Sequence, residues 1–403
     1  MASSVAPRPR SAIFHAVTHV WGRGYLDLFL NVCIPNQLAP GNIPALPAGS
    51  RYRILTKSIH REEIDAHPNV RALREVIPVD IILIDVLEQG GVLSGAYDLM
   101  IACHRQAVAD IIEAGAAILF LSADFVMSAN TMAAVVAHHR QGARAITTTG
   151  LRLNRGAFLA RLSEPDVLLS ALSPRALVAM ALPHLHAHTL SMFADADPFN
   201  KFPVAVYWRV GDEGLVARGL HLHPLMVDPV NPLLPVGTVD GAYLSQAVPD
   251  RSLVHVVTDS DDIQFFELTE AEREVLPAQG SGASMWRSLL VAATCDDHQR
   301  AFWRDHAILI HTRDVDGPQW TAAKRAAARY VARVVRLDPH RRTIYKWSKK
   351  YGLLLKRRDQ ALTRALRAVR QVARQSARSR KQISRAARIL QKRLRKSPLG
   401  RFR

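Results

Sequence analysis

The chain has 403 residues, a formal net charge of +18 at pH 7, 48% hydrophobic residues and 22% charged residues. These proportions are those of an ordinary globular protein, long enough to bury one large core or two moderate ones. The cysteines at positions 33, 103 and 295 are scattered and odd in number, which predicts reduced thiols and excludes a disulfide framework or a cysteine-rich zinc site.

No apolar stretch reaches the length of a membrane span, and the segment after the N-terminus is too polar for the core of a signal peptide. We therefore expect the body of the protein to lie in the cytoplasm.

The positive charge is concentrated at the C-terminus. Residues 341–403 carry 23 Lys and Arg against a single acid, Asp359, whereas the rest of the chain is mildly acidic. This contrast predicts two parts, a body over residues 1–338 and a basic tail over residues 339–403.

Strands and helices are predicted to alternate along the first half of the body. Such an alternation predicts an α/β fold with a Rossmann-like, mostly parallel sheet and right-handed crossovers. An Ala/Arg-rich helix over residues 319–337 closes the body. The predicted strands cover residues 12–19, 51–56, 80–85, 116–124 and 143–149, and the predicted helices cover residues 61–75, 97–114 and 129–141.

The most informative of these strands runs over residues 116–124. Its near-continuous apolar run predicts a strand buried on both faces at the centre of the sheet, with Asp124 delivered to the carboxyl edge. Open α/β folds bind ligands at that edge, and a carboxylate there can hold a divalent cation against a diphosphate. The alternative is that Asp124 caps the helix that follows.

Two later segments are further candidates for chemistry. In His221-Leu222-His223-Pro224, alternation places both imidazoles on one face of an extended segment, where they can complete a metal shell or position a phosphate. The alternative is two partly exposed histidines near a turn imposed by Pro224. Asp240 lies among small residues that allow a ligand to approach closely, which suits a general base.

Two other polar clusters are not predicted to be sites. The run Asp259-Ser260-Asp261-Asp262 is typical of a loop or a helix cap. The histidines at 184, 186 and 188 would share a face only on a strand, and Pro183 favours an interrupted helix, on which they diverge. The sequence also lacks Gly-x-Gly-x-x-Gly after the early strands and Gly-Lys-Ser, which disfavours dinucleotide dehydrogenases and P-loop NTPases.

Over about residues 12–265 the chain resembles nucleotide-sugar glycosyltransferases of the GT-A fold, of a degenerate, bacterial type. Ser122-Ala123-Asp124 stands where that family has Asp-x-Asp, with its first acid replaced by Ser122. Thr18-His19-Val20-Trp21-Gly22 resembles the nucleotide-facing loop after the first strand. His223 and Asp240 stand where the family has a late metal- or phosphate-binding histidine and a base.

The resemblance implies a nucleotide-sugar half at about residues 12–150 and an acceptor half at about 151–338. It implies transfer of a sugar from a nucleoside-diphosphate donor to a hydroxyl of a glycan or lipid-linked acceptor, in glycan or cell-envelope polysaccharide synthesis. Both inversion and retention at the anomeric carbon stay open, and inversion is expected because it needs only a single well-placed base. Thr18 and Asp124 would contact the donor, Asp124 and His223 would bind Mn²⁺ or Mg²⁺, and Asp240 would be the catalytic base.

The tail is predicted to form a long basic amphipathic helix, because its apolar residues recur at multiples of seven among Lys and Arg. Three interpretations remain open. The tail can lie on an anionic membrane, which would place the protein at the inner face. It can bind nucleic acid through phosphates, or it can be a partner helix or a disordered extension. The alternative to an enzyme is accordingly a scaffold or nucleic-acid-binding protein that acts through this tail.

Overall fold

The computed structural model describes residues 8–88, 95–164, 169–272 and 285–336, together with Thr343 and Lys346. The chain divides into a unit of Met1–Pro339 and a unit of His340–Arg403, and the elements below belong to the first. Apart from Thr343 and Lys346, the helical tail predicted over residues 339–403 lies outside the described residues, so its membrane and nucleic-acid partners stay predictions. None of the helices in the described ranges has the length and apolar character needed to cross a membrane.

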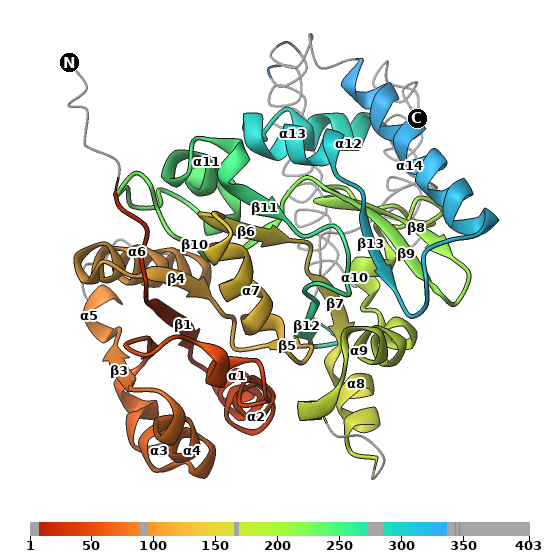
Figure 1. The fold of residues 1–403 in the computed structure, drawn as a ribbon. Coiled ribbons are helices and arrows are strands. Elements are labelled where there is room, and N and C mark those ends of the chain that lie inside the picture. Colours follow the sequence, from red (N-terminus) through yellow and green to blue (C-terminus); the bar gives the residue numbers. More distant parts are fainter. Residues whose placement is uncertain are drawn as a thin grey trace, which may run out of the picture. The chain divides into compact units, whose positions relative to one another are not determined.

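A seven-stranded sheet forms the larger part of the first unit, in the order β11-β6-β10-β4-β1-β2-β3 (Figure 1). All neighbouring strands are parallel except β10, which is antiparallel to both β4 and β6. The prediction of an α/β chain with a mostly parallel sheet is thus confirmed. The strands are β1 (Phe14–Val20), β2 (Arg51–Thr56), β3 (Val79–Leu83), β4 (Ala117–Phe120), β6 (Ala145–Thr148), β10 (His223–Val227) and β11 (Val254–Val256).

The helices between these strands follow the predicted apolar spacing, with one difference. The predicted helix over residues 61–75 is two helices, because His67 is extended and Pro68 opens a new first turn. The longest, α6, packs on β1 and β4, and Gly115 ends it in the left-handed conformation at φ 68°. These helices are α1 (Arg23–Leu28), α2 (Ile34–Gln37), α3 (Arg61–Ala66), α4 (Pro68–Val76), α5 (Asp85–Glu88), α6 (Ala96–Ala114) and α7 (Thr131–Arg140).

The strand predicted over residues 116–124 is shorter than expected. β4 ends at Phe120, a turn follows, and Asp124 directly precedes β5 (Phe125–Met127), which belongs to another sheet. Asp124 therefore lies beyond the carboxyl end of β4 rather than at the last position of that strand.

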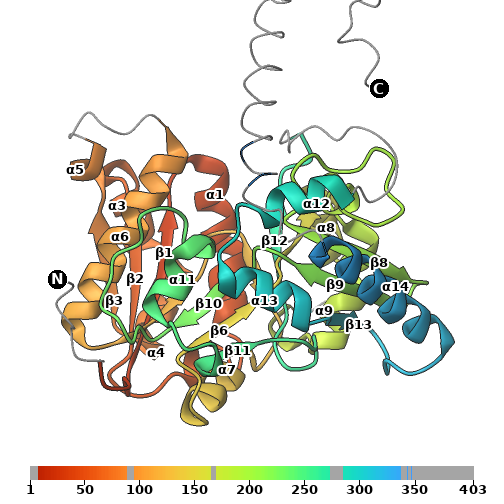
Figure 2. The ribbon, with the colours of Figure 1, turned by 90° about the horizontal axis from the view of Figure 1, so that it is seen from above.

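Two three-stranded sheets complete the unit, in the orders β5-β12-β7 and β13-β9-β8. The α14 helix, which the sequence predicts, packs across β8 and β9 on the side of the unit away from β1–β3 (Figure 2). The strands are β7 (Leu151–Asn154), β8 (Ala205–Val210), β9 (Gly214–Gly219), β12 (Phe265–Thr269) and β13 (Ile308–His311), and the helices are α8 (Arg155–Leu162), α9 (Pro174–Ala181), α10 (Ala187–Leu190), α11 (Leu244–Ala247), α12 (Met285–Ala292), α13 (Asp297–Asp305) and α14 (Pro318–Val335).

The two predicted halves of the body are interleaved in the structure. β10 and β11 come from the later half, yet they pair with β4 and β6 inside the seven-stranded sheet. Because β10 runs antiparallel, its first residue lies at the edge where β4 ends. The interleaving therefore brings residues from both halves to one edge of the sheet.

Candidate functional site

The carboxyl ends of β1 and β4 mark the point where the order of the sheet reverses. From β1 the chain builds outward through β2 and β3, and it then returns to place β4 on the other side of β1. In open α/β sheets the loops diverge at such a switch point and leave a crevice that binds ligands. The residues beyond Val20 and Phe120 are accordingly the first place to look for a site.

Asp124 lies beyond this edge and is held there by its backbone. Its carbonyl oxygen accepts a hydrogen bond from the Leu268 N–H at 2.8 Å, which ties it to β12. The residue is 9% exposed, and its Oδ1 atom is buried without a hydrogen-bond partner among the described residues. Buried carboxylate oxygens are nearly always paired, so an orphaned one indicates a place for a ligand or a cation.

The charge of Asp124 is destabilised by its surroundings. Burial, and next the charge of Glu267, raise the pKa of Asp124 to about 6, while Ser122 and Arg152 oppose the rise. Glu267 in turn accepts a hydrogen bond from Arg152 Nε at 3.1 Å. Gly150 leaves room for this carboxylate, because a Cβ there would come within 2.8 Å of Glu267 Oε1. Two acidic side chains, Asp124 and Glu267, and one arginine, Arg152, thus lie at this edge.

His223 begins β10 and faces the same edge. Its Nε2 atom lies 2.9 Å from the carbonyl oxygen of Phe120 and therefore carries a proton, and its ring lies against Phe125 and Phe265. Burial lowers the pKa of His223, although its bond to Phe120 and the charges of Glu267 and Asp240 oppose this. A neutral imidazole protonated on Nε2 keeps a lone pair on Nδ1, which can accept a hydrogen bond or bind a metal.

Asp240 lies in the helical turn before α11, and its charge acts on both His221 and His223. The Gln299 side chain donates to its carbonyl oxygen at 2.9 Å, which fixes the turn against α13. Asp240 is half-buried and lines a small hollow. The other residues of this hollow are Leu220, Leu222, Gly241, Leu244, Asp296, His298, Gln299 and Phe302.

Three of the four predicted site residues therefore lie in one electrostatic neighbourhood. The charge of Glu267 acts on both Asp124 and His223, and the charge of Asp240 acts on His223. The fourth residue, Thr18, is different. It is fully buried in β1 and its hydroxyl bonds the Tyr52 hydroxyl at 2.8 Å. Its side chain offers no surface to a ligand, so its predicted nucleotide contact has no support in this geometry.

Three residues toward this edge, Glu267, Arg152 and His104, were not singled out from the sequence. Glu267 and Arg152 lie on short strands, where nothing distinguishes them from ordinary outward-facing charges. His19 and His104 have rings 4.8 Å apart beside Phe120, and burial lowers the pKa of both, that of His19 to about 4. His104 follows Cys103 on the buried face of α6, which is the pattern of an ordinary core position.

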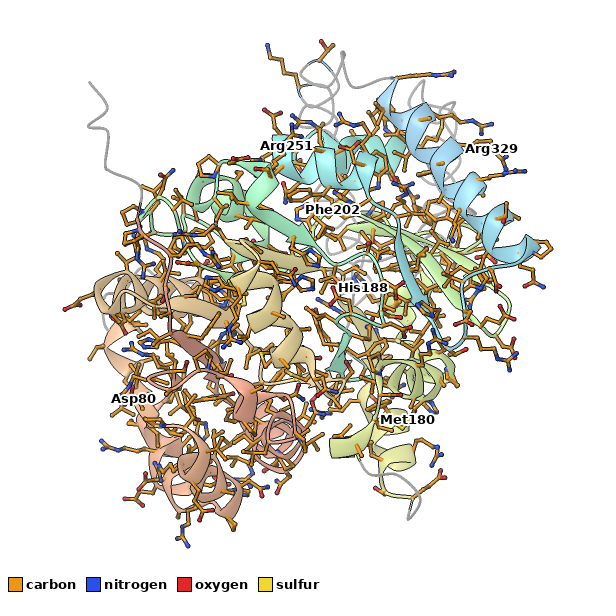
Figure 3. The ribbon with its side chains drawn as sticks, in the orientation of Figure 1. Asp80, Met180, His188, Phe202, Arg251 and Arg329 are labelled. Atoms are coloured by element: carbon orange, nitrogen blue, oxygen red, sulfur yellow. The ribbon has the colours of Figure 1, made fainter. Side chains whose placement is uncertain are left out.

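The three closely spaced histidines do not form a cluster. His186 Nδ1 accepts the His188 N–H at the start of α10, and its Nε2 lies 3.0 Å from the Glu270 carbonyl oxygen. His188, labelled in Figure 3, lies near Arg152, and burial together with this charge lowers the pKa of His188 to about 3. His184 belongs to the preceding helical turn.

Whether a divalent cation fits at this edge depends on the ligand atoms that the nearby side chains offer. Within the described ranges, no group of three ligand atoms that includes Asp124 lies within 4.8 Å. Mg²⁺ commonly binds through one or two carboxylates and takes its other ligands from water and substrate phosphates. Asp124, with its orphaned Oδ1, fits this mode, with Glu267 or His223 as a second contact. A cation here would thus require a ligand that brings oxygens.

No protein-family model matches the chain, and no curated protein matches its sequence. Among solved structures, the chain is similar to mouse xyloside xylosyltransferase 1 in its apo form, with 12% identity, a TM-score of 0.26, and coverage of 39% of this chain and 61% of that one. It is also similar to S. aureus TarS, with 10% identity, a TM-score of 0.29, and coverage of 72% and 42%. This chain thus spans less than two thirds of either protein. Both TM-scores lie well below the range of a shared fold, so function has to be derived from the residues of this chain.

Proposed function

We propose that the chain is a glycosyltransferase that binds a nucleoside-diphosphate sugar at the carboxyl edge of β1 and β4 and transfers the sugar to an acceptor hydroxyl. The observation that carries the proposal is the buried, orphaned carboxylate oxygen of Asp124 beside Glu267. Burial and the charge of Glu267 disfavour the ionised form of Asp124, and a cation bound together with a diphosphate would relieve this.

The diphosphate is the part of the donor that such an edge can recognise. When a sugar is displaced from it, negative charge grows on the leaving phosphate oxygens, and a bound Mn²⁺ or Mg²⁺ would stabilise that charge. Asp124 would hold this cation, and the Nδ1 atom of His223 would be the second protein contact. Arg152 holds the Glu267 carboxylate in place through their hydrogen bond.

The acceptor hydroxyl needs a base on the other side of the sugar. We assign this role to Asp240, because it is half-buried, lines the hollow described above, and its charge acts on His223. The base would take the hydroxyl proton as the oxygen attacks the anomeric carbon. A single base on the face opposite the leaving group would lead to inversion. The apolar side chains of the hollow would contact the acceptor or the sugar.

The proposal can be tested by release of nucleoside diphosphate. The full chain is incubated with a panel of nucleotide sugars and Mn²⁺, and the free nucleoside diphosphate is measured. Transfer to water suffices for the test, so the acceptor need not be known. We expect release from one donor class, and its loss in Asp124→Asn.

The matched control is Asp250→Asn. Asp250 caps a short helical turn through Ser252, well away from β4 along the chain. This variant should release nucleoside diphosphate at the wild-type rate. If wild type releases none from any donor and binds none, the enzyme assignment fails, and a scaffold acting through the basic tail becomes the better explanation.

A further inference from the structure

Two histidines from distant parts of the chain stack against each other at the β11 end of the large sheet. His138 lies in the last turn of α7 and His255 lies in β11. Their ring centroids are 3.7 Å apart and the ring planes differ by 21°. The two rings are therefore in face-to-face contact, although they come from elements far apart in the sequence.

Both rings direct Nε2 at the carboxylate of Asp262. The Nε2 atom of His138 lies 2.8 Å and 2.9 Å from its two oxygens, and that of His255 lies 3.1 Å from Oδ2. The candidate ligand atoms of the three residues all lie within 4.8 Å of one another. Three side chains from a helix, a strand and a loop thus converge on one point.

This donor set and its spacing are those of a transition-metal site. Two imidazoles and one carboxylate, with remaining positions open to water, suit Zn²⁺, Co²⁺, Ni²⁺ and Fe²⁺. Ligand atoms bonded at about 2.0–2.1 Å in neighbouring positions around a metal are separated by about 2.9 Å when the angle between them is near 90°. The observed nitrogen–oxygen separations bracket that value. Hard cations such as Mg²⁺ prefer all-oxygen shells and fit less well.

The three side chains are accessible to an ion, and within the described ranges no lysine or arginine pairs with Asp262. The side chains of His138, His255 and Asp262 are 20%, 32% and 29% exposed. Within the described ranges, the ion pairs of Asp262 are with these two histidines alone. The charge of His255 in turn acts on His306.

A second cluster of possible ligand atoms is already occupied by an arginine. Asp259, Asp261 and His311 also bring three ligand atoms together. There, however, the Arg175 guanidinium contacts Asp261 at 2.7 Å and also pairs with Asp314. A guanidinium already supplies the positive charge that a metal would bring, so this cluster carries no proposal.

The His138 cluster is also separate from the edge that carries Asp124. His255 pairs in register with Ile146, near the start of β6, whereas Asp124 lies beyond the end of β4. The two places are therefore toward opposite edges of the sheet, and one ion cannot serve both.

We propose that His138, His255 and Asp262 bind a divalent transition metal, with water completing the coordination. The ion would tie the C-terminal turn of α7 to the edge strand β11 and to the loop that leads into β12. This inference is independent of the transferase assignment, since none of the three residues belongs to the Asp124 site.

The test is a cobalt titration of the full chain, purified without a polyhistidine tag and stripped with a chelator. We expect visible absorption bands that saturate at one Co²⁺ per chain and disappear when Zn²⁺ is added. His138→Gln and His255→Gln should each weaken Co²⁺ binding at least tenfold, and Asp262→Asn should weaken it as well. The matched control, His184→Gln, should bind Co²⁺ as wild type does.

A second measurement does not depend on variants that fold. X-ray absorption at the zinc edge of the wild-type chain, loaded with one equivalent, should show two imidazole ligands. Absence of saturable cobalt bands, or a zinc spectrum without imidazole scattering, would overturn the proposal. So would cobalt bands that persist unchanged in both folded histidine variants, because the ion would then lie elsewhere.

Discussion

The carboxylate of Asp124 lies where the charge of Glu267 acts on it, and burial together with this charge raises the pKa of Asp124 to about 6. Glu267 comes from β12 and Asp124 follows β4, so the fold itself brings the two acids together. An arrangement that costs folding free energy is typical of functional sites, where stability is sacrificed for binding.

The first prediction concerns this cost. Because the pKa of Asp124 is higher in the folded chain than its ordinary value of 3.8, the folded chain binds more protons between about pH 4 and pH 6. The ionised carboxylate of Asp124 therefore lowers the free energy of unfolding by its full amount above about pH 6, and this effect is absent below about pH 4. We expect Asp124→Asn to raise the free energy of unfolding at pH 7 by about 1–3 kcal/mol, with the gain vanishing near pH 4. Denaturant unfolding at the two pH values measures this, and a variant less stable than wild type at pH 7 would refute it.

Glu267→Gln should move the ionisation of Asp124. Removing the neighbouring charge lowers the pKa of Asp124, whereas burial still holds it above its ordinary value. The midpoint of Asp124 ionisation, followed by carbon NMR of the labelled carboxyl group, should shift to lower pH. Glu270→Gln is the control, since Glu270 pairs with Arg155 and is not among the charges that shift Asp124. Equal midpoints in both variants would show that Glu267 does not act on Asp124.

Asp240→Asn should separate catalysis from donor binding. If Asp240 is the base, its loss lowers the rate of sugar transfer by about 10²–10⁴-fold while the donor Kd changes little. Asp296 also lines the hollow and caps α13, so Asp296→Asn tests whether this second carboxylate is the base instead. Wild-type turnover by Asp240→Asn, or a larger loss in Asp296→Asn, would move the base to another residue.

A fourth prediction concerns the opposite edge of the sheet. Asp228 is fully buried and accepts hydrogen bonds from the Ser11 N–H and from His139 Nε2, both at 3.0 Å, with Arg144 and Arg8 beside it. Asp228→Ala removes the buried carboxylate that balances the charges of Arg144 and Arg8 and should cost about 3–5 kcal/mol of stability. The exposed ion pair of Arg23 with Asp27 is the comparison, and Asp27→Ala should be nearly neutral. Similar losses in the two variants would contradict this ranking.

The fold was predictable where local pattern decides it. The apolar runs that became β2 and β4, and the spacing of α6 with Gly115 at its end, follow from side-chain periodicity and a left-handed stop. The pairing of β10 between β4 and β6 was not predictable, because strand order depends on contacts far apart in the chain.

The residues of the candidate site were likewise predictable only where the local sequence marks them. Asp124 was predicted as a site residue because it ends a strongly apolar run of the sequence, and Asp240 because small residues flank it. Glu267, Arg152 and His104 were missed, because their sequence neighbours are ordinary and only tertiary packing gives them a role. The run containing Asp262 was predicted to be a loop or a cap, since its two histidine partners lie far away or on another element.

The measurement that tests the central claim most directly is calorimetric titration of the full chain with nucleoside diphosphates in the presence of Mn²⁺. Asp124→Asn and Asp250→Asn are titrated in parallel. The account predicts binding of one nucleoside diphosphate by wild type and by Asp250→Asn, with at least tenfold weaker binding by Asp124→Asn or when Mn²⁺ is omitted. Binding that is equally tight in Asp124→Asn, or no binding of any nucleoside diphosphate by the wild type, would contradict it.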